Sequence, residues 1–352
     1  MHAEQRPAYV IEEGDATRDR DAILTAWSGH FGPDEEHAGK LAHFYEHCPF
    51  GTPIIRLLRH VESGQVAGVI AAVPRRMLLD GSNIRAAVIS HFSVLPAHRT
   101  LGPALMLQAA IVDACRGRFD FIYGIPNQKA TAILKRAGHT ILCQLGRYVK
   151  VLRYGQYLSR VMPAPLARPL APVVNAAVRV RHALRAATRA GTRCVWSDVP
   201  DPRMDAVWRG SDTDHGLLAV RDATLARWRF NTAPSERMRF LLVAQGERLC
   251  AWFACEDSTG SPGTLSVLDY WFADNALAKR RHAIKVLLDR AVADGHTAVD
   301  IAMTGARHAR DGWLAERFVH RSDAPVMGRW LHPDDPAPDS ARIHMTYSDQ
   351  DS

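Results

Sequence analysis

The sequence predicts a mixed α/β (α+β) protein of two domains, each with a mostly antiparallel central sheet flanked by helices. The chain has 352 residues, which is long for a single domain. Its first half places alternating apolar runs before a glycine-containing helix start. Its second half repeats that order of elements without the glycine. These three observations define the expected fold class.

The first domain is expected to begin with an antiparallel meander. Strands are predicted at residues 53–60 and 65–77, joined by the turn Glu62-Ser63-Gly64. A second turn, Leu79-Asp80-Gly81, leads to a strand that contains residues 88–95. Short connections of this kind make consecutive strands neighbours in one sheet.

The segment 91–106 carries the most specific pattern of the chain. Residues 99–104 fit Arg/Gln-x-x-Gly-x-Gly/Ala, and a helix is expected over 103–116. Gly102 would permit a tight turn, and Pro103 suits the first helical position. Free N–H groups and the helix dipole favour an anion at such a helix start. Taken alone, the pattern also fits an ordinary strand-to-helix turn.

A short strand is expected at 119–125 and a second helix at 128–137. The whole order of strand, loop, helix, strand and helix resembles the GNAT superfamily of acyl-CoA-dependent acyltransferases. In that family the second part reads Asn-x-x-Ala, then tyrosine, then Gly-Phe. The matching positions here are Asn127, Ala130, Leu134, Gly138 and His139.

The resemblance implies acetyl-CoA or another acyl-CoA as co-substrate, and no metal. In GNAT enzymes the strand before the loop pairs with the pantetheine arm, which implies coenzyme contacts for Phe92 and Val94. The loop amides hold the coenzyme diphosphate. The cofactor-binding residues implied there are Arg99, Thr100, Leu101, Gly102, Pro103 and Ala104, with Asn127 at the start of the next helix.

His91 is the candidate catalytic base, because it lies on the expected coenzyme strand and has an ordinary pKa near neutrality. The alternative is a core histidine held by a hydrogen bond. Strand alternation would place Ser90 and His91 on opposite faces. The tyrosine that protonates the leaving thiolate in many GNAT enzymes is replaced by Leu134, and Tyr123 and Tyr148 are the possible substitutes.

The second half shows a faint repeat of the first. Residues 41–45 (LAHFY) and 225–229 (LARWR) each precede a proline and an apolar strand. The elements expected to follow in the second half are strands 240–243, 248–255 and 264–272, helix 276–293 and strand 298–303. Because no glycine motif follows Phe272, we expect a GNAT-like domain that has lost its coenzyme loop. An unrelated α+β domain is the alternative.

Asp269 lies in an apolar strand of this second half (LSVLDYWF). It is either satisfied structurally or faces a cleft shared by the two halves, where it would bind the substrate amine. The expected boundaries are an acyl-CoA-binding domain at 8–153, a Pro/Ala/Arg-rich helical connector at 154–197, the degenerate domain at 198–335 and a polar tail at 336–352. The basic helical pattern at 173–193 could contact an anionic ligand or simply be solvated.

Composition and motif content limit the classes of partner that we expect. The net charge is +7, but no nucleic-acid-binding motif is visible, and no apolar run reaches about 18 residues. No secretory signal pattern begins the chain, so a cytoplasmic protein without stable membrane insertion is expected. The six cysteines form no CxxC pair, so neither a zinc site nor a disulfide framework is indicated.

The layout resembles tandem-GNAT proteins, including N-acyltransferases that modify nucleotide-linked amino sugars. This resemblance implies transfer of an acetyl or short acyl group to a primary amine on a small molecule, with an amino sugar as the first candidate. An aminoglycoside- or polyamine-type acetyltransferase is a second reading. A non-catalytic acyl-CoA-binding module is a third, which the missing tyrosine favours.

Overall fold

The computed structural model describes residues 7–153, scattered positions between 172 and 184, and residues 191–350 apart from 215, 232–237, 258–262, 306 and 333–337. Most of the basic helical pattern expected at 173–193 lies outside the described residues. Within this part of the chain, no helix is both long and apolar enough to cross a membrane.

The first half begins with strand β1 and two helices, continues with three long strands, and ends with two strand–helix alternations. Its elements are β1 (Tyr9–Gly14), α1 (Arg20–Trp27), α2 (Asp34–Leu41), β2 (Ile54–His60), β3 (Val66–Leu79), β4 (Ser82–Val94), α3 (Leu101–Cys115), β5 (Phe121–Gly124), α4 (Gln128–Arg136) and β6 (Thr140–Val151). A π-helical turn, Ala42–Glu46, extends α2. The meander, the strand predicted to contain residues 88–95 and the two helices predicted from the sequence are confirmed as elements of secondary structure.

The second half runs through the same order, except that the short strand β8 lies between its first two helices. Its elements are β7 (Thr192–Ser197), α7 (Met204–Arg209), β8 (Leu217–Ala219), α8 (Ala223–Asn231), β9 (Met238–Gln245), β10 (Arg248–Asp257), β11 (Thr264–Phe272), α9 (Leu277–Ala293), β12 (Ala298–Met303), α10 (Arg307–Ala315) and β13 (Val319–Trp330). A short strand, β14 (Ile343–His344), follows. The mixed α+β class and the repeated order of elements in the two halves are therefore confirmed.

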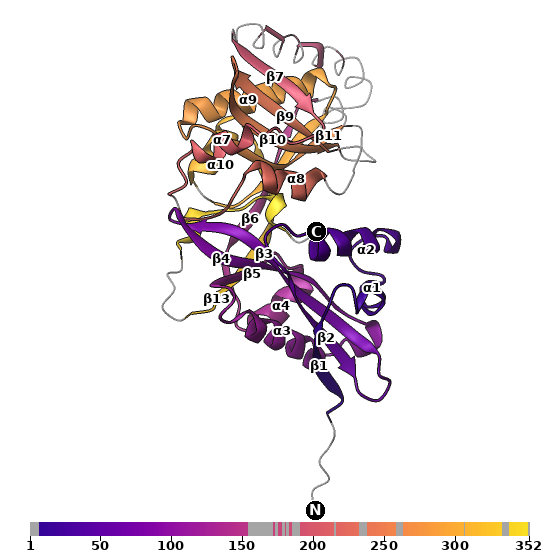
Figure 1. Ribbon diagram of the computed structural model, residues 1–352. Coiled ribbons are helices and arrows are strands. Elements are labelled where there is room, and N and C mark those ends of the chain that lie inside the picture. The colour runs from indigo at the N-terminus through magenta and orange to yellow at the C-terminus, as the bar shows by residue number, and fades with distance from the viewer. Residues whose placement is uncertain are drawn as a thin grey trace, which may run out of the picture.

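The described strands form one 14-stranded sheet that runs through both halves (Figure 1). Its main path is β1-β2-β3-β4-β5-β13-β6-β12-β11-β10-β9-β7, and β8 and β14 branch from β3. The last long strand of each half has crossed over. β13 pairs with β5, with Met327 opposite Gly124, while β6 pairs with β12, with Val151 opposite Ala298. The two halves are thus interlocked by strand exchange.

Helices cover both faces of the first half of the sheet. Trp27 of α1 and Phe44 pack on one face with Val88 of β4. Leu107 and Ile111 of α3 pack on the other face in a separate cluster. The second half has two corresponding clusters, one of which contains the buried apolar side chains of α9. This arrangement fixes the start of α3 next to the end of β4.

Two segments differ from the boundaries expected from the sequence. Residues 192–197, expected in the connector, form β7 and pair with β9. Residues 343–349, expected in a polar tail, are largely buried, and Ile343 and Met345 are fully so. Their alternating apolar side chains and the pairing of Ile343 with Leu217 explain why this segment packs rather than extending into solvent.

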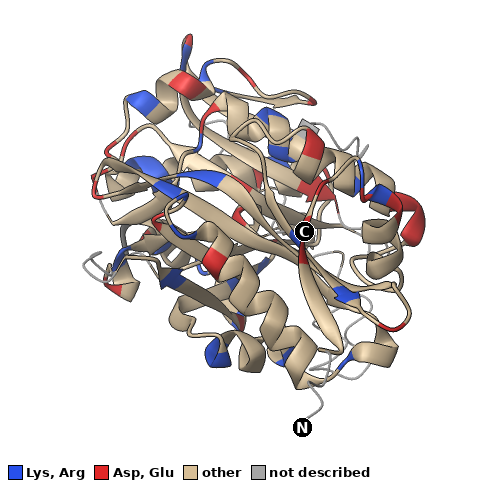
Figure 2. Ribbon diagram, turned by 60° about the horizontal axis from the view of Figure 1, so that its bottom comes forward, with Lys and Arg blue, Asp and Glu red and all other residues tan. Residues whose placement is uncertain are grey.

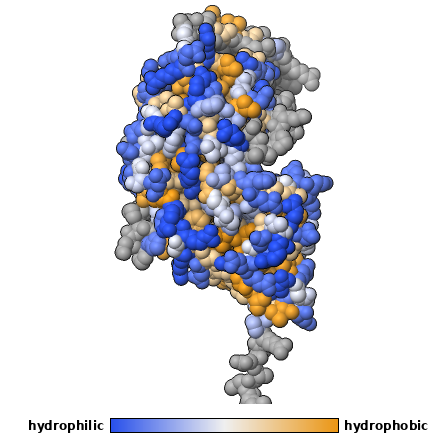
Figure 3. All heavy atoms as spheres, in the orientation of Figure 1, coloured by the Kyte–Doolittle hydropathy of each residue, from blue (hydrophilic) through white to orange (hydrophobic). Residues whose placement is uncertain are grey.

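Acidic and basic residues are interspersed along the ribbon in Figure 2. Hydrophilic residues cover most of the face seen in Figure 3, with hydrophobic residues in separate areas between them.

Candidate active site

Strands β4 and β5 separate partway along their length. They pair in parallel only from Ala86 opposite Phe121 to Val88 opposite Tyr123, and β4 then continues for six more residues to Val94. No described strand pairs with that edge of β4 beyond Val88. An extended ligand could add its own polar groups to such an edge.

A β-bulge interrupts β4 in this region. Val69 lies opposite Ser93 and Ala71 opposite Ser90, so β4 has one more residue than β3 between these pairs. His91 lies within the bulge and has a positive φ of 50°. A bulge leaves backbone groups outside the regular ladder and redirects side chains.

The start of α3 lies immediately after this strand. The helix begins at Leu101 rather than Pro103, and Thr100 is its N-cap residue. The Thr100 amide donates to the His98 carbonyl, while the amides of Leu101 and Gly102 belong to the first turn, which has no intrahelical acceptor for them. The helix therefore directs two amides and the positive end of its dipole toward solvent.

The predicted roles of Gly102 and Pro103 at a tight turn are wrong. Gly102 lies in the first turn without a positive φ, and Pro103 occupies the third helical position. Gly102 instead matters for its small size, since a Cβ placed on it would meet no atom within 4 Å. The missing side chain leaves open space over the amides.

Arg99 is held against the protein on the same side. Its Nε donates to the Val94 carbonyl at 2.9 Å, and its Nη2 lies 2.5 Å from Nε2 of His30. The guanidinium therefore stays near the end of β4. Burial, together with Arg99, lowers the pKa of His30, which favours the neutral imidazole beside the guanidinium.

Two buried polar side chains next to this region were missed from the sequence. Gln108, on α3 one turn beyond Ala104, is fully buried, and neither its Oε1 nor its Nε2 has a hydrogen-bond partner among the described residues. The same holds for Oγ of Ser93 on β4. The signal for Gln108 was a lone amide within an apolar helix. Such groups are costly to bury unless a ligand or water satisfies them.

His91 lies in a cage of aromatic side chains. Its ring stacks on Trp27 at 4.4 Å, and the rings of Phe31, Phe44 and Tyr45 lie within 5.5 Å. Nδ1 of His91 lies 3.3 Å from the Tyr45 hydroxyl. These contacts put the ring on the same face as Val88. Simple strand alternation would place His91 on the same face of the sheet as Ile89, and the bulge moves it to the opposite face.

Burial lowers the pKa of His91 to about 3, with smaller contributions from nearby cations such as Lys40. The side chain is only 2% exposed. A general base works best with a pKa near the operating pH, so this environment makes His91 a weak base. It favours the alternative of a structural histidine, and the catalytic role of His91 stays a prediction.

The other residues named from the sequence are spread over the first half. Phe92 and Val94 contribute to the cluster beneath α3. Asn127 caps α4, since its Oδ1 accepts a hydrogen bond from the Ala130 amide at 3.0 Å. Leu134 is buried on α4. Burial raises the pKa of Tyr123, which makes that hydroxyl a weaker acid.

Tyr148, the second possible acid, lies on β6 and belongs to the core of the second half. Its ring contacts His320 of β13 at 5.3 Å. It therefore lies at the strand exchange rather than on the β4 or α3 side of the first half.

Asp269 lies in a fully buried ion network of the second half. Its Oδ1 accepts hydrogen bonds from Arg221 Nε and from Thr346 Oγ1, both at 2.9 Å. Arg221 also pairs with Asp349 at 2.5 Å. Burial raises the pKa of Asp349, against the opposing effect of Arg221. Asp269 Oδ2 has no hydrogen-bond partner among the described residues, so its substrate-binding role stays a prediction.

The same contacts fill the opening between two strands of the second half, β11 and β12. β11 and β12 pair in parallel only from Thr264 to Val267, and then separate as β4 and β5 do. Thr346 lies in this opening, because it bridges to Met303 of β12 and bonds to Asp269 of β11. The C-terminal segment therefore occupies the position that corresponds to the open edge of β4.

Comparison with known proteins supports the architecture. No family model matches the chain, and no curated protein matches its sequence. A GCN5-related N-acetyltransferase from Anabaena variabilis has a TM-score of 0.64 at 12% identity, with 92% of this chain and 73% of that chain covered. A tandem GNAT protein from the clavulanic acid biosynthesis pathway has a TM-score of 0.53 at 14% identity, with 93% and 100% covered.

N-myristoyltransferase from Saccharomyces cerevisiae, solved with bound myristoyl-CoA, has a TM-score of 0.57 at 9% identity, with 97% of this chain and 84% of that chain covered. At such identities the similarity concerns the fold. The chain has the two-domain GNAT fold shared by tandem-GNAT proteins and N-myristoyltransferase.

Replacing Asp269 with alanine should lower the free energy of unfolding by about 3–5 kcal/mol, because Arg221 keeps only part of its buried partner set. Urea unfolding measures this. The control is Asp257→Ala, which removes a half-exposed partner of Arg239 and should cost about 1 kcal/mol or less. Equal losses in the two variants would contradict the structural role of the network.

Acid should destabilise the protein partly through His91. Its folded pKa is depressed, so the stabilisation is complete above the unfolded pKa of about 6.5 and is lost as pH falls toward about 3. Between pH 7.5 and pH 5 the wild type should lose about 2 kcal/mol more than His91→Asn. The exposed His320→Asn serves as control. Identical pH dependence in His91→Asn and wild type would show that His91 is not held neutral.

Proposed function

We propose that the protein is an acyl-CoA-dependent N-acyltransferase with one coenzyme site per chain, in the first half. The observation that carries this proposal is the unpaired edge of β4 beyond Val88, next to the amides of Leu101 and Gly102. The edge suits an extended amide-containing arm, and the helix start suits a diphosphate. Together they match the resemblance to GNAT enzymes inferred from residues 91–104.

The unsatisfied amide of Gln108 fits the same proposal. A ligand that enters between β4 and β5 brings polar groups toward the buried face of α3. Leu101 and Met106, which are 44% and 36% exposed, add apolar surface beside the helix start. Both observations support a site for a long molecule with polar and apolar parts.

A single site follows from the difference between the two halves. In the second half, Thr346 bridges β11 and β12 where β4 and β5 of the first half are open. The start of α9 is also preceded by Asp274-Asn275-Ala276 and lacks the glycine of the first half. Because Thr346 fills the opening between β11 and β12, we infer a structural role for the second half of the chain.

The reaction proposed is attack of a neutral amine nitrogen on the thioester carbonyl carbon. The carbon–sulfur bond then breaks, coenzyme A leaves as the thiol, and the amine loses one proton. The backbone N–H of Phe92 is the candidate donor to the oxyanion, because Phe92 lies in the bulge of β4, beyond the last residue that pairs with β5. Because its aromatic cage makes His91 a weak base, a chain of water molecules is the route proposed for the amine's proton.

The acceptor proposed is a primary amine on an amino sugar or a nucleotide-linked amino sugar. This part of the proposal depends on the resemblance to tandem-GNAT sugar N-acyltransferases. A non-catalytic acyl-CoA-binding module is the second candidate, favoured by Leu134 in place of the usual tyrosine and by the weak basicity of His91.

Thiol release from acetyl-CoA with a panel of amines tests these alternatives. Turnover with amino sugars or their nucleotide-linked forms supports the proposal. Turnover only with aminoglycosides or polyamines would contradict the proposed acceptor. Tight coenzyme binding without thiol release from any amine would identify the binding module.

Gly102→Val should weaken coenzyme A binding at least tenfold, because its side chain would occupy the open space over the α3 amides. The fold should be retained, since a Cβ at Gly102 meets no neighbour. Calorimetry measures affinity and stoichiometry. The matched control is Gly39→Val, because Gly39 is also helical with no neighbour within 4 Å of an added Cβ. Unchanged affinity in Gly102→Val, or two coenzymes per chain, would contradict the proposal.

A further inference from the structure

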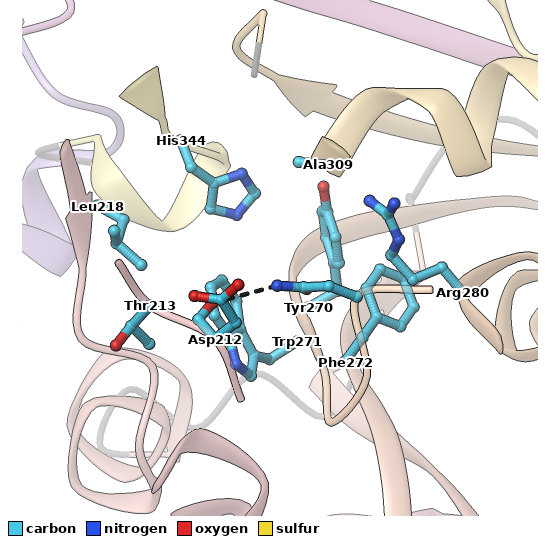
Figure 4. Close-up of a pocket in the computed structure, with 10 residues that line it drawn as sticks. Asp212, Thr213, Leu218, Tyr270, Trp271, Phe272, Arg280, Ala309 and His344 are labelled. Atoms are coloured by element: carbon cyan, nitrogen blue, oxygen red, sulfur yellow. Dashed lines mark hydrogen bonds between the residues drawn. The ribbon is translucent and has the colours of Figure 1, made fainter. Parts of the chain in front are cut away.

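A second cavity, which the proposed coenzyme site does not use, lies in the second half of the chain (Figure 4). It opens to solvent, and the empty space between its lining atoms, with the open solvent at its mouth included, is about 420 Å³. It lies where the end of β11 meets α9, α10, β8 and β14. Its lining residues are Asp212, Thr213, Leu218, Tyr270, Trp271, Phe272, Asn275, Arg280, Ala309 and His344.

Arg280 is the unusual member of this wall. It lies in the first turns of α9, it is only 6% exposed, and its Nε and Nη1 have no hydrogen-bond partner among the described residues. Burial lowers the pKa of its guanidinium, and Asp274 and Asp311 act on it only through longer-range attraction. A buried guanidinium stays charged, and among the described residues no carboxylate forms an ion pair with it, which makes its burial costly.

The remainder of the cavity is mainly apolar and aromatic. Tyr270, Trp271 and Phe272 present three successive rings from the end of β11, and Leu218 and Ala309 add aliphatic surface. The indole Nε1 of Trp271 already donates to Ser211 Oγ at 2.8 Å. These walls suit the hydrocarbon or ring part of a small molecule.

The acidic group nearest the cavity lies at its other end. Figure 4 shows the Arg280 guanidinium beside Tyr270, with Asp212 and Thr213 across the cavity. Asp212 is exposed at the rim, whereas Arg280 is buried in the wall. The cavity therefore offers its buried, positively charged end to a ligand.

This cavity is separate from the proposed coenzyme site. It adjoins β8, where Leu218 pairs with Leu78 of β3, and Leu78 in turn lies opposite Asn83 near the start of β4. The bulge at His91 is eight residues further along β4, or about 26 Å at roughly 3.3 Å per residue. One small ligand cannot occupy both places.

We propose that this cavity is a binding site for a small organic anion. A carboxylate or phosphate group of the ligand would pair with Arg280, and its apolar body would lie against Tyr270, Trp271 and Phe272. A guanidinium accepts either group through paired N–H donors, so carboxylate and phosphate share this chemistry. The site is independent of acyl transfer, and its test needs no coenzyme.

Calorimetry with benzoate, phenyl phosphate and benzylamine tests the site on the full chain. At least one of the two anions should bind the wild type, and the one that binds identifies the anionic group. Benzylamine, with a similar ring and the opposite charge, should not bind. Arg280→Met should weaken the anion at least tenfold.

Lys279→Met is the matched control, because Lys279 is an exposed cation on the same turn of α9 and does not line this cavity. It should bind the anion like the wild type. If Arg280→Met does not fold, Ala309→Phe replaces it, since the added ring fills the cavity and should abolish binding. Failure of both anions to bind the wild type, or unchanged binding in the folded cavity variant, would overturn the proposal.

Discussion

Strand β13 lies between β5 and β6, and β6 in turn pairs with β12. Each half of the chain therefore supplies the strand that completes the sheet of the other half. Without β13, β5 would lose its neighbour on the side opposite β4, and the separation between β4 and β5 would have no fixed outer wall. The geometry of the candidate active site thus depends on a strand that lies about 200 residues away in sequence.

Within this shared sheet, each half has an opening between two parallel strands, and the two openings differ in what fills them. In the first half, β4 and β5 separate beyond Val88 and Tyr123, and the start of α3 lies beside the unpaired edge. In the second half, the corresponding opening holds Thr346, which is fixed by Asp269 and the buried Arg221. A buried ion network is sensitive to substitution, because the loss of one partner leaves a buried charge without compensation and destabilises the fold. This network is therefore the structural basis for the proposed division between a coenzyme-binding half and a supporting half.

Much of the fold could be predicted from the sequence because its elements are locally encoded. Turns such as Leu79-Asp80-Gly81, together with alternating apolar runs, indicated the meander, and the helix after Thr100 followed from its apolar periodicity. The strand exchange was not predictable, because β13 looks the same in sequence whichever neighbour it pairs with. The position of Ile343 and Met345 was missed because the surrounding residues are polar.

For the site residues too, local structure could be predicted from the sequence, whereas tertiary contacts could not. The segment 99–104 does begin a helix next to a free strand edge, as its pattern indicated. The bulge that turns His91 into an aromatic cage depends on the register between β3 and β4, which no local pattern records. Likewise, Asp269 is paired by Arg221 and Thr346, which are distant in sequence. Tertiary contacts decided both environments.

Hydrogen–deuterium exchange of the full chain, with and without coenzyme A, tests most directly the claim that one opening of the sheet is a ligand site and the other is closed. The account predicts slower exchange on coenzyme addition for backbone amides at residues 89–104, with no change at residues 268–280. Slower exchange at 268–280, or no change at 89–104 under saturating coenzyme A, would contradict it.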